Sequence, residues 1–264
     1  MNYLGSKIRL SDFIEKIITN SIKEPLSEYS FCDLFAGTGA VGNHFHNKVG
    51  SIIYNDREYY SYVLNRSFYS DIDERTYQPL LGELNNLTGI EGFIFHEYSE
   101  LGRAQRLYFS ESNGKKIDAI RIRIEELFKN SVINENFYIL LLATLLKAAD
   151  RVANTASVYC AYLKKLKKTA RKPIKLIPIK RASHPTPYEI RREDNNVLIK
   201  SIEGDILYLD PPYNGREYGC YYHLLNTISL YDDKLKPRGK AGLRPMRHPD
   251  SALKRKPMRL FLNY

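Results

Sequence analysis

The chain of 264 residues is long enough for one large domain or for a core domain with an insertion, and its 43% hydrophobic content argues against disorder. No run approaches roughly 18 uncharged apolar residues, and no basic segment followed by an apolar one opens the chain, so we expect neither a membrane-spanning helix nor a secretory signal. Three widely separated cysteines form no metal-type pair, so we expect unpaired thiols in the cytoplasm and no bound metal.

The net charge of +10 is concentrated in two segments. Residues 161–181 carry nine Lys/Arg and no acid, and residues 234–259 carry ten Lys/Arg and one acid. Such clustering, with tyrosines nearby, favours a polyanion as partner, although two solvated surfaces would also explain it.

The N-terminal part predicts a strand, a glycine loop, a helix and a second strand. SFCDLF (30–35) indicates a short buried strand that runs into AGTGAVG (36–42), and SIIYND (51–56) indicates a second strand ending on an acid. A unit of this kind implies a parallel sheet covered on both faces. Before it, NYLGSK (2–7) precedes a helix with apolar residues at helical spacing: Leu10, Phe13, Ile14, Ile17 and Ile18.

Residues 71–183 are predicted to form a mostly helical insertion, because no alternation typical of strands occurs there. After a helix over about 57–70, the segment 71–115 reads as irregular and polar. The apolar spacing then predicts three helices, over 116–130, 134–150 and 156–168.

The chain then returns to the core. Residues 185–194 lead back towards the sheet, and a short helix (195–202), a strand (205–210) and a helix (220–232) follow. We therefore divide the chain into a core (1–70 and 184–264) and the insertion. Beyond residue 232 only RLFLNY (259–264) has the pattern of a strand, so C-terminal strands of the sheet are expected to be missing. The resulting open edge would be covered by a partner chain or by self-association.

The strand over 205–210 ends in LDPPYNGREY (209–218). Two prolines exclude both a helix and a strand ladder, and Asp210 is held extended because a proline follows it. The carboxylate of Asp210 and the backbone carbonyls beside it therefore predict an acceptor site next to the aromatic ring of Tyr213. A plain strand-ending turn is the alternative.

The glycine loop GTGAVG (37–42) favours a nucleotide-like ligand, since glycines allow the backbone to approach it closely. Asp56 lies 19 residues after Gly37, which alone would also fit a nicotinamide cofactor. Asp33, just before the loop, instead suits a ligand with an ammonium group, and hydride transfer has no use for DPPY.

DLFAGTGAVG, an acid at the next strand end and LDPPY together resemble S-adenosylmethionine-dependent methyltransferases that act on amino groups of nucleic acid bases. With NYLGSK, DPPYNGREY and DRVANTASVYCAYLKKLKK (150–168), the chain resembles the D12 class of adenine-specific DNA methyltransferases, of restriction-modification type. The resemblance implies a Rossmann-like sheet with a helical target-recognition insertion, S-adenosylmethionine as cofactor and double-stranded DNA as partner. It covers about 1–60 and 150–231.

The resemblance also implies roles for individual residues. Lys7 would lie near the methionine carboxylate, Asp56 would accept from the ribose, and Asp194 would bind the adenine amino group of the cofactor. The full cofactor set is Tyr3, Lys7, Asp33, Phe35, Gly37, Gly39, Asp56, Asp194 and Asn195. Each carboxylate has a structural alternative: Asp33 would cap the following turn, and Asp56 and Asp194 would be N-caps of helices.

In the same resemblance, Asp210 and the Pro211 carbonyl accept the two hydrogens of the target amino group. Pro212 stiffens the turn and Tyr213 stacks on a base that is flipped out of the duplex. Phosphate contacts are expected from Lys164, Lys165, Lys167, Lys168, Arg171, Lys172 and Arg216, and base reading from Asn154, Tyr159 and Tyr162. Two other functions stay open: an RNA base methyltransferase, and a catalytically weak DNA-binding remnant suggested by the short C-terminal segment.

Overall fold

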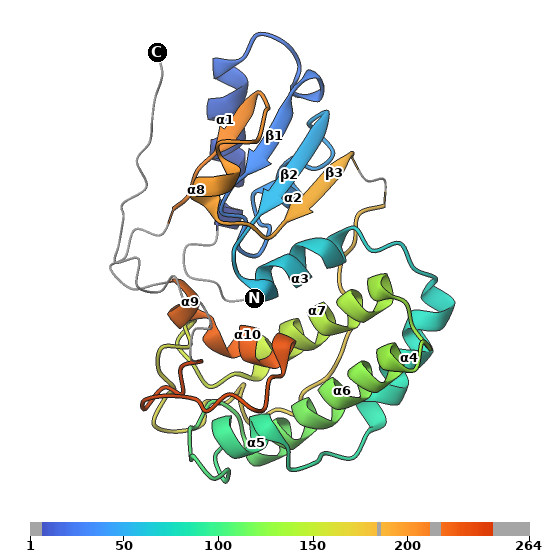
Figure 1. The fold of residues 1–264 in the computed structure, drawn as a ribbon, viewed down its shortest axis with the longest axis vertical. Coiled ribbons are helices and arrows are strands. Elements are labelled where there is room, and N and C mark those ends of the chain that lie inside the picture. The colour runs from blue at the N-terminus through green and yellow to red at the C-terminus, as the bar shows by residue number, and fades with distance from the viewer. Residues whose placement is uncertain (1–6, 184–185, 212–217, 245–264) are drawn as a thin grey trace.

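The computed structural model describes residues 7–183, 186–211 and 218–244, and it places a sheet at one end and a group of helices at the other (Figure 1). Tyr3, Pro212, Tyr213, Arg216 and the predicted strand 259–264 lie outside the described residues. The expectations for them stay predictions.

The sheet is entirely parallel, as the sequence predicts. Its strands are β1 (Ser30–Asp33), β2 (Ser51–Asn55), β3 (Tyr188–Arg191) and β4 (Ile206–Tyr208), in the order β3-β2-β1-β4. The segment expected only to lead back towards the sheet thus contributes β3. Within the described residues β4 pairs with β1 alone, so it forms an edge of the sheet.

Helices cover both faces of this sheet, and each face has its own apolar core. On one face α1 (Ser11–Ser21) and α2 (Gly42–Phe45) pack on Phe31, whose ring stacks on Phe45 at 4.6 Å between centroids. On the other face α8 (Asn195–Leu198) places Leu198 against Cys32 and Leu34. The βαβ unit read from the sequence and its covered sheet are therefore confirmed.

The second part of the molecule is built from longer helices around α7 (Glu135–Val152). Most of the α7 side chains are buried, because α3 (Tyr59–Phe68), α6 (Glu111–Lys129) and α10 (His223–Leu230) pack around it (Figure 1). The remaining helices are α4 (Glu74–Asn86), α5 (Phe93–Tyr98) and α9 (Tyr218–Tyr221). One apolar core joins α3 and α10 to the helices of the insertion. The division into core and insertion stays a prediction.

Two predictions for the insertion are wrong. Residues 71–115 are not irregular, because α4 and α5 lie within them; Asp73 caps α4 by accepting from the Arg75 amide, and Tyr77, Leu81 and Leu84 form its buried stripe. Residues 156–168 form bends and turns in place of a helix. The predicted helix over 220–232 is interrupted at Tyr222, which separates α9 from α10.

Replacement of Gly39 by alanine is expected to destabilise the fold, whereas the same replacement of Gly82 is not. Gly39 has φ +75°, and a Cβ there would lie 2.1 Å from Oδ1 of Asn65, which is buried and hydrogen-bonded to Ser61 O. Gly39→Ala should therefore lower the free energy of unfolding by about 2 kcal/mol or more. Gly82 lies in α4 with nothing within 4 Å of the added Cβ, so Gly82→Ala should stabilise by about 0.5–1 kcal/mol. Urea unfolding of both variants measures this, and equal effects would contradict the role of Gly39.

Candidate active site

Three strands end at the same edge of the sheet, and an acid stands at or just after each end. Asp33 is the last residue of β1, Asp56 follows β2, and Asp210 lies two residues beyond β4. The chain order of the strands changes direction between β1 and β4, and in open parallel sheets such a switch point is where ligands bind. The sheet thus brings together acids that are far apart in the sequence.

The glycine loop after β1 is held by Asp56. The Asp56 carboxylate accepts from the Gly37 amide at 2.8 Å with one oxygen and from the Glu58 amide at 2.9 Å with the other. Ser61 donates to the Gly37 carbonyl at 2.5 Å. Since Glu58 is the N-cap of α3, the alternative of Asp56 as an N-cap is wrong. Burial raises the pKa of Asp56.

Asp33 is a buried acid with an incomplete set of partners. It is 1% exposed, and the backbone amides of Phe35 and Gly42 favour its ionised form. The alternative that Asp33 caps the following turn stays a prediction. Oδ1 nevertheless has no hydrogen-bond partner among the described residues. Burial, and secondly the nearby Asp56, raise the pKa of Asp33 to about 7. An ammonium group beside Oδ1 would supply the missing partner.

Asp194 lies at the N-terminus of α8, as the structural alternative predicts. Its Oδ1 accepts from the Asn196 amide at 2.9 Å, and its Oδ2 lies 3.7 Å from the Arg57 guanidinium. Asp194 is exposed, and a role towards the cofactor stays a prediction. Asn195 accepts from Asn55 Nδ2 at 2.6 Å.

Asn55 is a residue of this edge that the sequence argument missed. It is 0% exposed and donates to the Leu34 carbonyl at 3.4 Å and accepts from the Glu193 amide at 3.0 Å. It therefore ties the ends of β1 and β2 to the segment that precedes α8. The available signal was an amide side chain at the end of an otherwise apolar strand.

Asp210 forms an ion pair with Lys7. Lys7 Nζ lies 2.6 Å from Asp210 Oδ2, and the two side chains are 20% and 30% exposed. Pro211 follows and is exposed. The structure thus brings together one residue expected at the cofactor and one expected at the target base. Phe35, also predicted at the cofactor, is half-buried beside the core on the α8 face.

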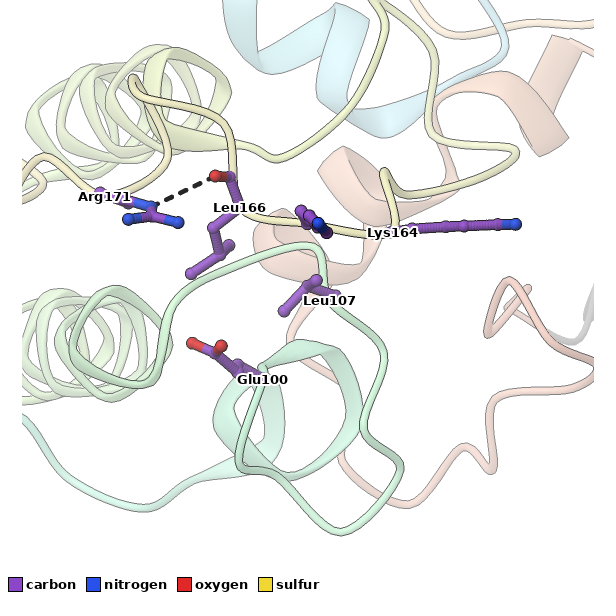
Figure 2. Close-up of a pocket in the computed structure, with 6 residues that line it drawn as sticks. Glu100, Leu107, Lys164, Leu166 and Arg171 are labelled. Carbon is purple, nitrogen blue, oxygen red and sulfur yellow. Dashed lines mark hydrogen bonds between the residues drawn. The ribbon is translucent and has the colours of Figure 1, made fainter.

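The basic segment lines an open cavity of about 520 Å³ in the helical part (Figure 2). Lys164, Lys165 and Arg171 contribute to its walls together with Glu100, Leu107 and Leu166. Lys168 and Lys172 are exposed. Lys167 is less available for a contact with a phosphate, because its Nζ donates to the Thr155 carbonyl at 2.7 Å.

Two of the three residues predicted to contact DNA bases, Asn154 and Tyr159, are buried and form hydrogen bonds within the protein. Asn154 is 0% exposed, and its amide group bonds Leu107 O, Leu163 O and Lys167 N. Tyr159 is 1% exposed and donates to Asp150 at 2.9 Å. Their burial contradicts base reading in this structure, whereas Tyr162 is only half-buried. The bonds of Asn154 also explain why 156–168 forms turns, since they bind this segment to residues 107–108.

Comparison with known proteins decides the family. The family model of the D12 class N6 adenine-specific DNA methyltransferases matches residues 3–258. The chain belongs to this family. It is therefore an adenine-specific DNA methyltransferase, and the RNA alternative is not favoured.

The chain is also similar to several proteins named as type II methyltransferases. The type II methyltransferase M.NlaIII of Neisseria lactamica is 52% identical over 92% of this chain and 73% of its own length. M.FokI of Planomicrobium okeanokoites is 38% identical over 93% of this chain but 39% of its own length. M.CviAII of Paramecium bursaria Chlorella virus 1 is 38% identical over 86% of this chain and 68% of its own length.

The comparison with solved structures found no significant match. In the described part of the chain, no helix combines the length and the apolar character that crossing a membrane requires.

Proposed function

We propose that this member of the D12 class transfers the methyl group of S-adenosylmethionine to the N6 amino group of an adenine turned out of double-stranded DNA, as the modification enzyme of a restriction-modification system in the cytoplasm. One observation carries the residue assignment: Asp33, Asp56 and Asp210 converge at the switch point of the sheet. The names of the similar proteins support the restriction-modification context.

The residues at this edge fit the cofactor. Its ammonium, ribose hydroxyls and adenine amine are donors, and the edge presents carboxylates, which only accept when ionised. Asp33 has a buried oxygen that finds no hydrogen-bond partner in the described part of the chain. Gly37 and Gly39 have φ +53° and +75°, and as glycines they leave the tightest part of the loop without side chains. In this proposal Asp33 holds the ammonium, Asp56 accepts from the ribose, and Asp194 with Asn195 lies at the adenine. When bound, the cofactor supplies an electrophilic methyl group.

Asp210 and the Pro211 carbonyl prepare the target amino group. The amino nitrogen is a poor nucleophile because its lone pair is delocalised into the ring. Two acceptors on its two hydrogens favour tetrahedral geometry and localise the lone pair on nitrogen. This nitrogen would accept the methyl group of a bound cofactor, which would leave as the thioether, and the nitrogen would then release one proton to solvent. Most of the rate gain comes from positioning and charge, so no general base is required.

The basic cavity is proposed to contact DNA phosphates. Replacing Lys164, Lys165 and Arg171 with glutamine should weaken binding to all duplexes alike and reduce the salt dependence of affinity by up to about 0.9 per lost contact in the log–log slope. Lys23→Gln, an exposed lysine near the sheet, is the matched control and should leave the slope unchanged. Fluorescence anisotropy at several salt concentrations measures both. An unchanged slope in the triple variant would contradict the assignment.

Transfer from radiolabelled cofactor to unmodified bacterial DNA and to RNA tests the proposed function. We expect incorporation into DNA only. Incorporation only into RNA would overturn the proposal, and binding of DNA and cofactor without transfer would identify the chain as a remnant. Digestion of the methylated DNA with methylation-sensitive nucleases would then identify the recognition sequence, for which a short palindrome is the class expectation.

The open edge at β4 is proposed to be covered by a partner chain or by a second copy. Its support is that β4 pairs only with β1 in the described sheet, and that Leu207 is 43% exposed. Sedimentation of the purified protein at several concentrations would detect self-association.

A further inference from the structure

The contact between Lys7 and Asp210 links the cofactor region to the site of the target base. Lys7 Nζ donates to Asp210 Oδ2 at 2.6 Å, although 203 positions separate the two residues. The pair is only partly exposed, so solvent and salt screen it less than a surface pair. The backbone at Lys7 is also fixed, because its carbonyl accepts from the Leu10 amide at 2.8 Å and from Ser11 Oγ at 3.0 Å.

This ion pair conflicts with the role that the proposed function gives to Asp210 and with the role near the cofactor carboxylate that the sequence predicts for Lys7. A carboxylate that binds an ammonium is a weaker acceptor for the amino group of a base, because the ammonium offsets its negative charge. The ammonium group of Lys7 can bind the carboxylate of a cofactor with its full charge only if it releases Asp210. While it is paired with Lys7, Asp210 is therefore a weakened acceptor for the base.

We propose that Lys7 is a positioning residue that exchanges partners. It binds Asp210 in the cofactor-free protein and binds the cofactor carboxylate when the cofactor enters, which frees Asp210 for the target amino group. This inference rests on the proposed function. Because coupling between two sites is reciprocal, cofactor and target base then favour each other's binding, and a base that arrives before the cofactor meets a paired Asp210.

A double-mutant cycle on binding tests the exchange without methyl transfer. The probe is S-adenosylhomocysteine, which carries the carboxylate but no sulfonium charge, and calorimetry measures its affinity for the wild-type protein, Asp210→Asn, Lys7→Met and the double variant. Asp210→Asn removes the competitor for Lys7 with little change in shape. We expect it to tighten binding roughly five- to tenfold when Lys7 is present and not at all in the Lys7→Met background.

Two controls make the result specific. 5′-Methylthioadenosine lacks the amino-acid part of the cofactor and should bind Asp210→Asn and wild type equally. Asp210→Ser serves as a second variant, and circular dichroism checks folding of each protein. Unchanged or weaker binding to Asp210→Asn, or tightening that persists without Lys7, would overturn the exchange while leaving the proposed function intact. Failure of the folded wild-type protein to bind the probe would overturn both.

Discussion

Asp210→Ala is expected to reduce methyl transfer to DNA by roughly 100- to 1,000-fold, to a level near background. In the proposed mechanism the variant loses one of the two acceptors that localise the lone pair of the target nitrogen. Loss of a single group that stabilises a transition state costs on the order of 100- to 1,000-fold. Affinity for the cofactor should not fall, because in the proposed site Asp33 and Asp56 hold it elsewhere along the edge, and release of Lys7 from Asp210 should raise it by up to roughly tenfold. Single-turnover transfer and calorimetric titration measure the two quantities.

Glu203→Ala is a matched control for that experiment. Glu203 is an exposed acid that precedes β4, at the opposite end of the strand from Asp210. It should retain full transfer. Retained turnover in Asp210→Ala would refute the role of Asp210, and a loss of cofactor binding parallel to the loss of transfer would assign this residue to the cofactor.

Asp33→Asn is expected to weaken cofactor binding by roughly ten- to a hundredfold, since a hydrogen bond to a charged group contributes about 1.5–3 kcal/mol. The pKa of Asp33 is raised to about 7, mainly by burial, so the wild-type carboxyl is partly protonated near neutral pH. Only the ionised form attracts an ammonium. Wild-type affinity should therefore rise between about pH 5.5 and 7.5, and the Asn variant should show a flat profile.

The same pKa has the opposite consequence for the stability of the cofactor-free protein. The folded protein binds a proton on Asp33 up to about pH 7, whereas an unperturbed carboxyl releases it near 3.8. The contribution of Asp33 to stability is therefore complete below about 3.8 and is lost as the pH rises through about 7. Asp33→Asn should remove this pH dependence in urea unfolding. A cofactor affinity that does not depend on pH in the wild-type protein would contradict the assignment.

The edge of the sheet could be predicted because its signals are local. Short apolar runs that end on Asp33 and Asp56, and a run that ends before two prolines at Asp210, mark strand ends, and parallel strands gather those ends on one side. The glycine loop likewise has positive φ angles at Gly37 and Gly39, a backbone conformation that glycine adopts readily. Asn55 escaped prediction because its importance lies in bonds to residues 193–195, and such long-range pairing leaves no periodic pattern.

The insertion is harder to predict, because long-range contacts and not local patterns determine its structure. In α4, Pro79 and many polar residues hide a stripe of only three buried side chains. In 156–168, a local pattern with helical character yields to hydrogen bonds that join the buried Asn154 to Leu163 and Lys167 within the segment and to Leu107 outside it. The Lys7–Asp210 pair is likewise invisible in the sequence, since a motif match assigns each residue a role but not its partner in the folded chain.

Nucleoside analysis of DNA methylated by the purified protein tests the central claim most directly. After transfer from labelled S-adenosylmethionine, the DNA is digested to nucleosides and the methylated product is identified by mass spectrometry. Label in N6-methyladenine alone, absent when Asp210→Ala replaces the wild type, is the predicted result. Label in a methylated cytosine, or in N6-methyladenine formed equally well by Asp210→Ala, would contradict the account.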